Sequence, residues 1–249
     1  MAWGEITTTM IDEIETNLLC SKTKIVKNYS ELFYDDIPII PIPFFGNIKT
    51  AKIITIGANP SSKELVDNQW HEDMSVLQIT NKLISYFNNN PHKWFDVWEV
   101  ALNKIGFSYK DGTAAHIDLC PWATKSLSSL DSLGLTDKTI QLFSESVPAF
   151  IETLTECSES SFVLMAGTVT KRYWLNDFIY KFANSEYFSL NPSPKIEKGG
   201  PFINKHVINI ANRKLTVLFS SSSPSATGEK KKILPDLIYK SKDFILQNI

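Results

Sequence analysis

Short runs of apolar residues alternate with helical patterns along most of the chain. Residues 52–56 form one such run, which Gly57 ends, and residues 115–119 and 161–165 form two more. Each run has the length of a buried strand and precedes a turn and a stretch with apolar residues at helical spacing. Recurring strand–loop–helix units predict an α/β fold in which helices flank a mostly parallel sheet.

Two further strands are predicted near the carboxyl end, at residues 202–210 and 214–219. Aromatic residues recur at helical spacing between residues 79 and 105, and the Asn-Asn-Asn-Pro sequence at 88–91 divides this stretch into two helices. The last patterned segment, residues 234–249, is again helical. We therefore expect a three-layer α/β/α arrangement around a central sheet of four or five strands.

The amino-terminal part is less regular. Residues 11–19 predict a short amphipathic helix, and Ser61 with Glu64 resembles a capping box at a later helix start. Alternate prolines between residues 37 and 46 forbid a helix and predict an extended segment at the surface. No repeat or linker divides the chain, so residues 1–249 are expected to form a single domain.

Composition limits the possible functions. The 249 residues are 43% hydrophobic, which suffices for one good core, and the formal net charge is −2. A nucleic acid would therefore have to be held by a local basic patch, because the protein has no general positive field. The 3 cysteines and 4 histidines are scattered, so neither a disulfide framework, an Fe–S cluster nor a metal site is indicated.

The sequence predicts no signal peptide or membrane span, because no run of about 18 apolar residues occurs. We expect a protein that works as a monomer in the cytoplasm of a prokaryotic or virus-infected cell, without a membrane partner. Neither a metal nor an organic cofactor is expected.

An unusual polar loop follows each of four predicted strands. These loops comprise residues 57–61, 116–122, 167–168 and 220–228. Because ligands of parallel sheets bind where the strands end, the four loops are expected to converge on one site.

These loops resemble motifs of the uracil-DNA glycosylase superfamily, nearest to its mismatch-specific and single-strand-selective branches. Gly-Ala-Asn-Pro at 57–60 resembles the Gly-x-Asn-Pro that follows the first strand there. Asp-Leu-Cys-Pro at 118–121 resembles an Asn-Leu-Cys-Pro motif, and Ser-Pro-Ser at 223–225 resembles the Pro-Ser loop after the last strand. Order, spacing and strand context agree over residues 53–228. The resemblance implies a DNA glycosylase with a uracil-DNA glycosylase-like fold.

The resemblance also implies roles for three residues. Asn59 would hold the water that attacks C1′ of the sugar, beside Ala58 at the flipped base. Ser223 stands where many relatives place a histidine or asparagine that stabilises the leaving oxygen, and it is a weaker partner than histidine. The alternative for Asn59 is a plain turn residue before Pro60.

Asp118 departs from the family pattern, which has a base-reading asparagine here. An ionised carboxylate would repel uracil O4, whereas a buried, protonated aspartic acid can donate to cytosine N3 and accept from the 4-amino group. We therefore hypothesise a cytosine-type substrate. The alternative is an Asp that caps a helix or binds a backbone amide.

The remaining candidates would hold the flipped nucleotide. Trp70 lies near the place where relatives stack an aromatic on the base, and a core position is its alternative. Serines and lysines of the loops are candidate phosphate ligands, although serine runs are often plain loops. They are Ser61, Ser62, Ser222, Ser225, Lys171 and Lys230.

Together these features predict excision of a modified cytosine, either hydroxymethylated or glucosylated as in some phage genomes. Excising ordinary cytosine would be lethal to the cell, so a role in defence against phages is the attractive conjecture. Three rivals stay open: ordinary uracil repair, a non-catalytic module that binds DNA, and a hydrolase of free nucleosides.

Overall fold

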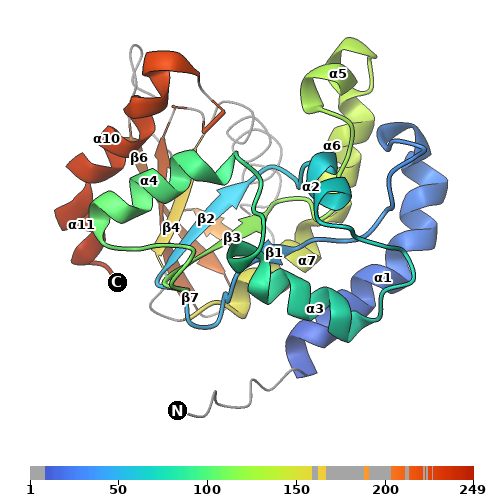
Figure 1. Ribbon diagram of the computed structural model, residues 1–249, viewed down its shortest axis with the longest axis horizontal. Coiled ribbons are helices and arrows are strands. Elements are labelled where there is room, and N and C mark those ends of the chain that lie inside the picture. Colours follow the sequence, from blue (N-terminus) through green and yellow to red (C-terminus); the bar gives the residue numbers. More distant parts are fainter. Residues whose placement is uncertain are drawn as a thin grey trace.

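The computed structural model describes most of the chain, with gaps in the carboxyl-terminal third (Figure 1). The described residues are 9–158, 162–166, 188–190, 203–210, 213–220, 222, 224–225 and 227–249.

A mixed, mostly parallel β-sheet forms the centre of the α/β fold, in the order β1-β3-β2-β4-β7-β6-β5. Five strands have five to eight residues, and two short strands, β1 and β5, lie at the edges. β3, β2, β4 and β7 are mutually parallel, whereas β1, β6 and β5 pair antiparallel with their neighbours. The strands are β1 (Phe44–Phe45), β2 (Ile53–Gly57), β3 (Ala114–Asp118), β4 (Phe162–Ala166), β5 (Phe188–Leu190), β6 (Ile203–Ile210) and β7 (Arg213–Ser220).

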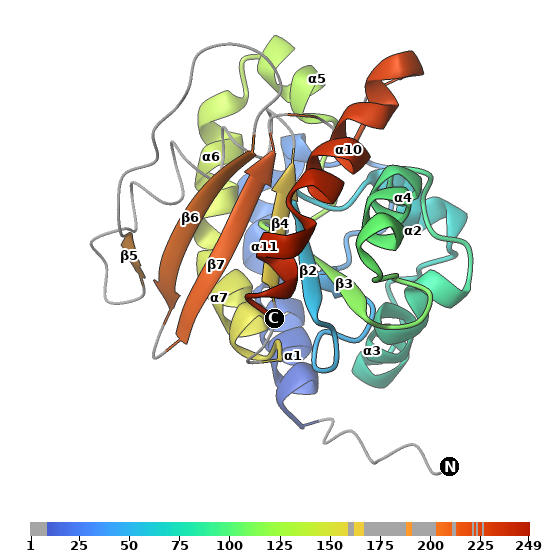
Figure 2. The same ribbon diagram turned by 90° about the vertical axis from the view of Figure 1, so that its left-hand side faces the viewer.

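Helices cover both faces of the sheet. Figure 2 shows α4, α10 and α11 in front of the strands and α1, α6 and α7 behind them. The helices are α1 (Thr9–Tyr29), α2 (Ser62–Asp67), α3 (Val76–Ser85), α4 (Phe95–Ile105), α5 (Leu127–Ser132), α6 (Thr136–Glu145), α7 (Val147–Thr155), α10 (Ile233–Lys240) and α11 (Lys242–Leu246). Short 3₁₀ helices are η1 (Ser30–Leu32), η2 (Tyr86–Asn88) and η4 (Gly228–Lys232).

The predicted strands form the sheet because their side chains are buried on both faces. Every residue of β2, β3 and β4 is buried. Such continuous burial suits strands that lie between two helical layers and needs no polar alternation. The register pairs Gly57 of β2 with Asp118 of β3, so the first two polar loops leave the sheet side by side.

Two sequence expectations about local structure are wrong. The proline-rich segment does not lie at the surface: residues 40–46 are buried, and Phe44–Phe45 forms β1 beside β3. Prolines are tolerated there because an edge strand leaves one side of its backbone unpaired. The first helix extends over Thr9–Tyr29, well beyond the predicted residues 11–19, because its apolar face continues through Ile25 and Tyr29 into the core.

Candidate functional site

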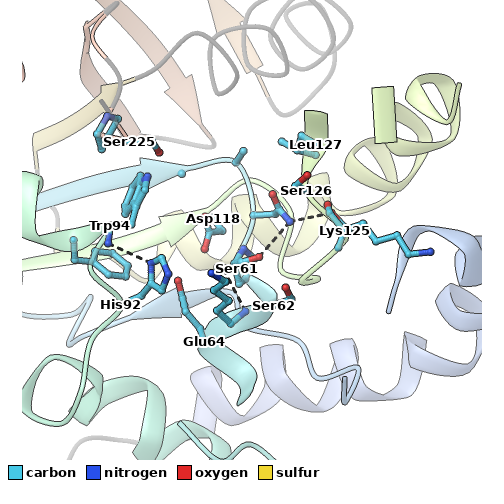
Figure 3. A pocket seen from close by; sticks show the side chains of 18 of the residues that line it. Ser61, Ser62, Glu64, His92, Trp94, Asp118, Lys125, Ser126, Leu127 and Ser225 are labelled. Carbon is cyan, nitrogen blue, oxygen red and sulfur yellow. Dashed lines mark hydrogen bonds between the residues drawn. The ribbon is translucent and has the colours of Figure 1, made fainter. Parts of the chain in front are cut away.

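A cavity of about 500 Å³ lies at the carboxyl ends of the parallel strands (Figure 3). Residues 57–64, Asp118, Ala166 and residues 224–225 contribute to its walls. Three of the four predicted loops therefore converge, while the loop that begins at Gly167 lies outside the described residues. The volume falls within the range of small-molecule sites, about 300–1,000 Å³.

Asn59 lines the cavity with its side-chain amide held in one orientation. Its Nδ2 donates to Thr124 Oγ1 at 3.1 Å and, more weakly, to the carbonyl oxygens of Pro60 at 3.3 Å and Trp122 at 3.4 Å. Two carbonyl acceptors facing one amide atom identify that atom as the nitrogen. No residue that the structure describes donates to Oδ1. Oδ1 is therefore the atom that can accept a hydrogen bond from a ligand.

Asp118 is buried at the end of β3, as its predicted role requires. Its side chain is 3% exposed, and Oδ1 lies 3.3 Å from Nε2 of His116, which is 2% exposed. Gly57 makes this arrangement possible, because a Cβ at that position would lie 2.4 Å from Asp118 Oδ1 and 2.8 Å from His116 Nε2. Glycine is needed here for close approach, since Gly57 does not have a positive φ.

A chain of buried hydrogen bonds connects Tyr109 and Thr55 to His116. The Thr55 hydroxyl lies 2.7 Å from His116 Nδ1 and 2.5 Å from the Tyr109 hydroxyl, and its distance to the Ala115 carbonyl oxygen is 3.3 Å. When Thr55 donates to Nδ1, Nε2 carries the ring proton and donates to Asp118.

Glu64 brings a second carboxyl group into the same cavity. It is the third residue of α2 and 4% exposed, and its Oε2 has no hydrogen-bond partner in the described structure. Burial, and secondly the charge of Asp118, raise the pKa of Glu64 well above its usual value. The predicted helix start at Ser61 is confirmed, but its capping box is only half formed: the Glu64 carboxyl accepts from the Ser61 backbone N–H, whereas the Ser61 side chain accepts from the backbone of Lys63 and not from that of Glu64. Glu64 also lines the cavity.

The structure separates the two candidate base contacts Ala58 and Trp70. Ala58 lines the cavity with Asn59. Trp70 is 3% exposed and lines a different pocket, where Lys82 Nζ lies 5.2 Å from its ring centroid. The core alternative therefore holds for Trp70. Among the described residues, Trp94 is the tryptophan that lines the cavity, and its ring lies 5.1 Å from that of His116.

The candidate phosphate ligands are distributed unevenly. Ser61, Ser62 and Ser225 line the cavity. Ser222 and Lys230 do not; the Ser222 backbone donates to the Ser220 hydroxyl, and Lys230 is exposed in η4. Lys171 and the catalytic candidate Ser223 lie outside the described residues.

Two lysines stand at the cavity. Lys63 is exposed on its wall, whereas Lys125 is half-buried and its Nζ donates to the carbonyl oxygen of Glu31 at 3.0 Å. Lys63 is thus free to move toward a phosphate, and Lys125 is tied to the backbone. These two residues supply positive charge beside the cavity in a chain whose net charge is −2.

Sequence reasoning missed Glu64, Trp94 and Thr124 as site residues. Glu64 matches a capping pattern, and Trp94 belongs to an aromatic stretch that also supplies core residues, so neither differs in sequence from a structural residue. Thr124 orients Asn59 from 65 positions away, a contact that no local pattern encodes.

Within the described ranges, no group of three or more His, Cys, Asp or Glu side chains is placed to hold a metal ion. No helix in that part of the chain is long and apolar enough to cross a membrane. A scan against protein-family models and a search of curated proteins each found no match.

Proposed function

We propose that the protein is a DNA glycosylase that flips a base into the cavity and hydrolyses its N-glycosidic bond. The observation that carries this proposal is the held amide of Asn59, whose Nδ2 has three acceptors and whose Oδ1 is left for a ligand. A water that donates to Oδ1 would be oriented for attack. Because an amide is a very weak base, such a site suits a reaction whose sugar has already developed oxocarbenium character.

In the proposed reaction the bond between C1′ and the base nitrogen breaks, and the electron pair leaves with the base. The oxygen of the water that Asn59 orients bonds to C1′, and that water loses a proton to solvent. The departing base anion takes up a proton, so the products are an abasic site and a neutral free base. Positioning of the water contributes to the rate because it replaces a random encounter.

The cavity also suits a flipped base. Trp94 offers an aromatic ring at the wall, and stacking on such a ring contributes about 1–3 kcal/mol per base. This contact takes the place predicted for Trp70. Flipping itself costs a few kcal/mol, which the stacking and the polar contacts would offset.

The proposed substrate is a modified cytosine, hydroxymethylated or glucosylated, and the proposed setting is defence against phages that carry such DNA. Asp118 in place of the family's asparagine supports a cytosine-type base over uracil. The cavity of about 500 Å³ exceeds the needs of an unmodified pyrimidine and leaves room for a substituent. The experiment must distinguish excision of a modified cytosine from excision of uracil.

The test uses end-labelled oligonucleotides with one uracil, cytosine, 5-hydroxymethylcytosine or its glucosylated form. Wild-type protein and Asn59→Ala are incubated with each, and alkali then cleaves abasic sites. The proposal predicts cleavage at the modified cytosine that the variant loses by about 10²-fold or more. Cleavage at uracil alone would support uracil repair, and tight binding without cleavage would support a non-catalytic module.

A further inference from the structure

A second buried carboxyl group stands beside Asp118 with no assigned role. Glu64 lies on α2, and Figure 3 shows its carboxyl group and that of Asp118 pointing toward the same part of the cavity. Its Oε2 is buried and unpartnered among the described residues. An unsatisfied buried oxygen is costly, so one that faces a ligand cavity indicates a group that meets a ligand.

The backbone N–H of Ser61 and the Tyr86 hydroxyl both hydrogen-bond to the Glu64 carboxyl, yet Oε2 has no partner among the described residues. The Tyr86 hydroxyl of η2 accepts the backbone N–H of His92 at 2.9 Å and is hydrogen-bonded to the Glu64 carboxyl. His92 lines the cavity from the loop before α4, and Asp118 faces it from β3. No cation pairs with Glu64 in the described structure.

The two carboxyl groups cannot both hold a charge at low cost, because like charges in a buried site repel. Asp118 Oδ1 lies 3.3 Å from Nε2 of His116, so this oxygen already has a polar neighbour. Burial, and secondly the charge of Asp118, raise the pKa of Glu64, so Glu64 is the carboxyl group that keeps a proton.

We propose that Glu64 is a specificity-determining residue that donates a hydrogen bond to the ring nitrogen of the bound base, while Asp118 accepts from the neighbouring amino group. The sequence predicts the donor role for Asp118; here Glu64 takes the donor role and Asp118 the acceptor role. This inference rests on the proposed glycosylase function and names the chemistry that its cavity selects.

The donor–acceptor pair selects a class of base. Cytosine and its 5-substituted derivatives present an acceptor at N3 beside a donor at the 4-amino group, which matches a protonated Glu64 as donor and a carboxyl oxygen of Asp118 as acceptor. Uracil and thymine present N3–H and O4, the reverse pattern, so O4 would face the accepting oxygen of Asp118 and the Glu64 O–H would have no acceptor on the ring nitrogen. Adenine presents the same acceptor–donor pair at N1 and the 6-amino group. Because its ring system is larger, it tests whether the cavity also selects a base by size.

The test measures equilibrium binding by fluorescence anisotropy. The probes are labelled oligonucleotides with one uncleavable 2′-fluoroarabino nucleotide of 5-hydroxymethylcytosine, cytosine, adenine or uracil, and a tetrahydrofuran abasic analogue as reference. We expect wild-type protein to prefer 5-hydroxymethylcytosine over uracil by about 5- to 150-fold. The preference should fall as pH rises, because deprotonation of Glu64 removes the donor.

Two variants separate the donor role from a structural role. Glu64→Gln keeps an N–H donor at every pH, so it should retain the preference and lose its pH dependence. Glu64→Leu has no donor and should lose the preference. The matched control is Glu15→Gln, because Glu15 on α1 is equally buried, its pKa is also raised, and it lies outside the cavity. This control should keep the wild-type preference and its pH profile.

The inference is overturned if Glu64→Leu keeps the wild-type base preference, or if Glu64→Gln keeps the wild-type decline with pH. A folded wild-type protein that binds every probe as weakly as the abasic analogue, and cleaves no oligonucleotide, would contradict the proposed function itself. Asn59-dependent cleavage of uracil with unchanged behaviour of the Glu64 variants would retain the glycosylase and remove only the inference.

Discussion

Replacing Gly57 with alanine introduces a methyl group between two buried polar side chains. The new Cβ would lie 2.4 Å from Asp118 Oδ1, 2.8 Å from His116 Nε2 and 3.0 Å from His116 Cε1. Ordinary contacts of this kind begin at about 3.4 Å. The methyl group therefore overlaps the Asp118 oxygen by about 1 Å. The substitution adds no backbone strain, because Gly57 lacks a positive φ.

The overlap has to be relieved by moving Asp118 or His116, which are only 3% and 2% exposed. Overpacking of this sort costs about 1–3 kcal/mol. Separating these two buried polar groups leaves one of them unsatisfied and adds about 1–3 kcal/mol. The total is about 2–6 kcal/mol. A domain of 150–250 residues loses about 2–4 °C of Tm per kcal/mol, so Tm should fall by at least about 4 °C.

Urea unfolding followed by circular dichroism measures this loss for wild type, Gly57→Ala, Asp118→Ala and the double variant. Truncating Asp118 removes the closest atom, so the double variant should be more stable than the sum of the single changes predicts. Two results would refute the reasoning: a Gly57→Ala free energy of unfolding within about 0.5 kcal/mol of wild type, or strictly additive changes.

Three further changes test other parts of the structure. Thr55→Val leaves two buried polar atoms unpaired and should cost about 1–3 kcal/mol for each in urea unfolding, well above the control Thr153→Val, whose hydroxyl makes only a local helix bond. Thr124→Val removes the acceptor that orients Asn59 and should lower kcat more than it raises KM; an unchanged kcat would argue against positioning. Glu15 has a raised pKa because it is buried, so the folded state keeps a proton that the unfolded chain releases above about pH 4.5. Wild-type stability should therefore decline as pH rises above that value, and Glu15→Met should flatten the curve; parallel stability–pH curves would contradict this assignment.

The order and type of the elements follow closely from local patterns. The run at residues 52–56 is mostly apolar and is followed by a polar loop, a pattern typical of a strand buried on both faces. The run at residues 115–119 is short and contains His116 and Asp118 between its apolar residues. The wrong predictions about local structure concern features that depend on contacts between elements distant in sequence. The prolines between residues 37 and 46 indicate extended structure, but only contact with β3 determines that the segment is buried.

Some residues of the site could likewise be predicted from local sequence, and others could not. Ala58 and Asn59 could be predicted because they stand in the loop that directly follows β2, and Asp118 because it is the last residue of β3; the sheet register then brings them together. Trp70 and Trp94 could not be told apart, because both are tryptophans in segments that connect helices. Their roles depend on which wall of the packed structure each reaches.

The most direct measurement of the central claim is the release of free base from DNA, identified by mass spectrometry. DNA containing glucosylated 5-hydroxymethylcytosine, 5-hydroxymethylcytosine, cytosine or uracil is incubated with wild-type protein or Asn59→Ala. The account predicts a released modified cytosine that accumulates with wild type and falls by about 10²-fold or more with the variant. Release of no base from any DNA, or release that Asn59→Ala leaves unchanged, would contradict it.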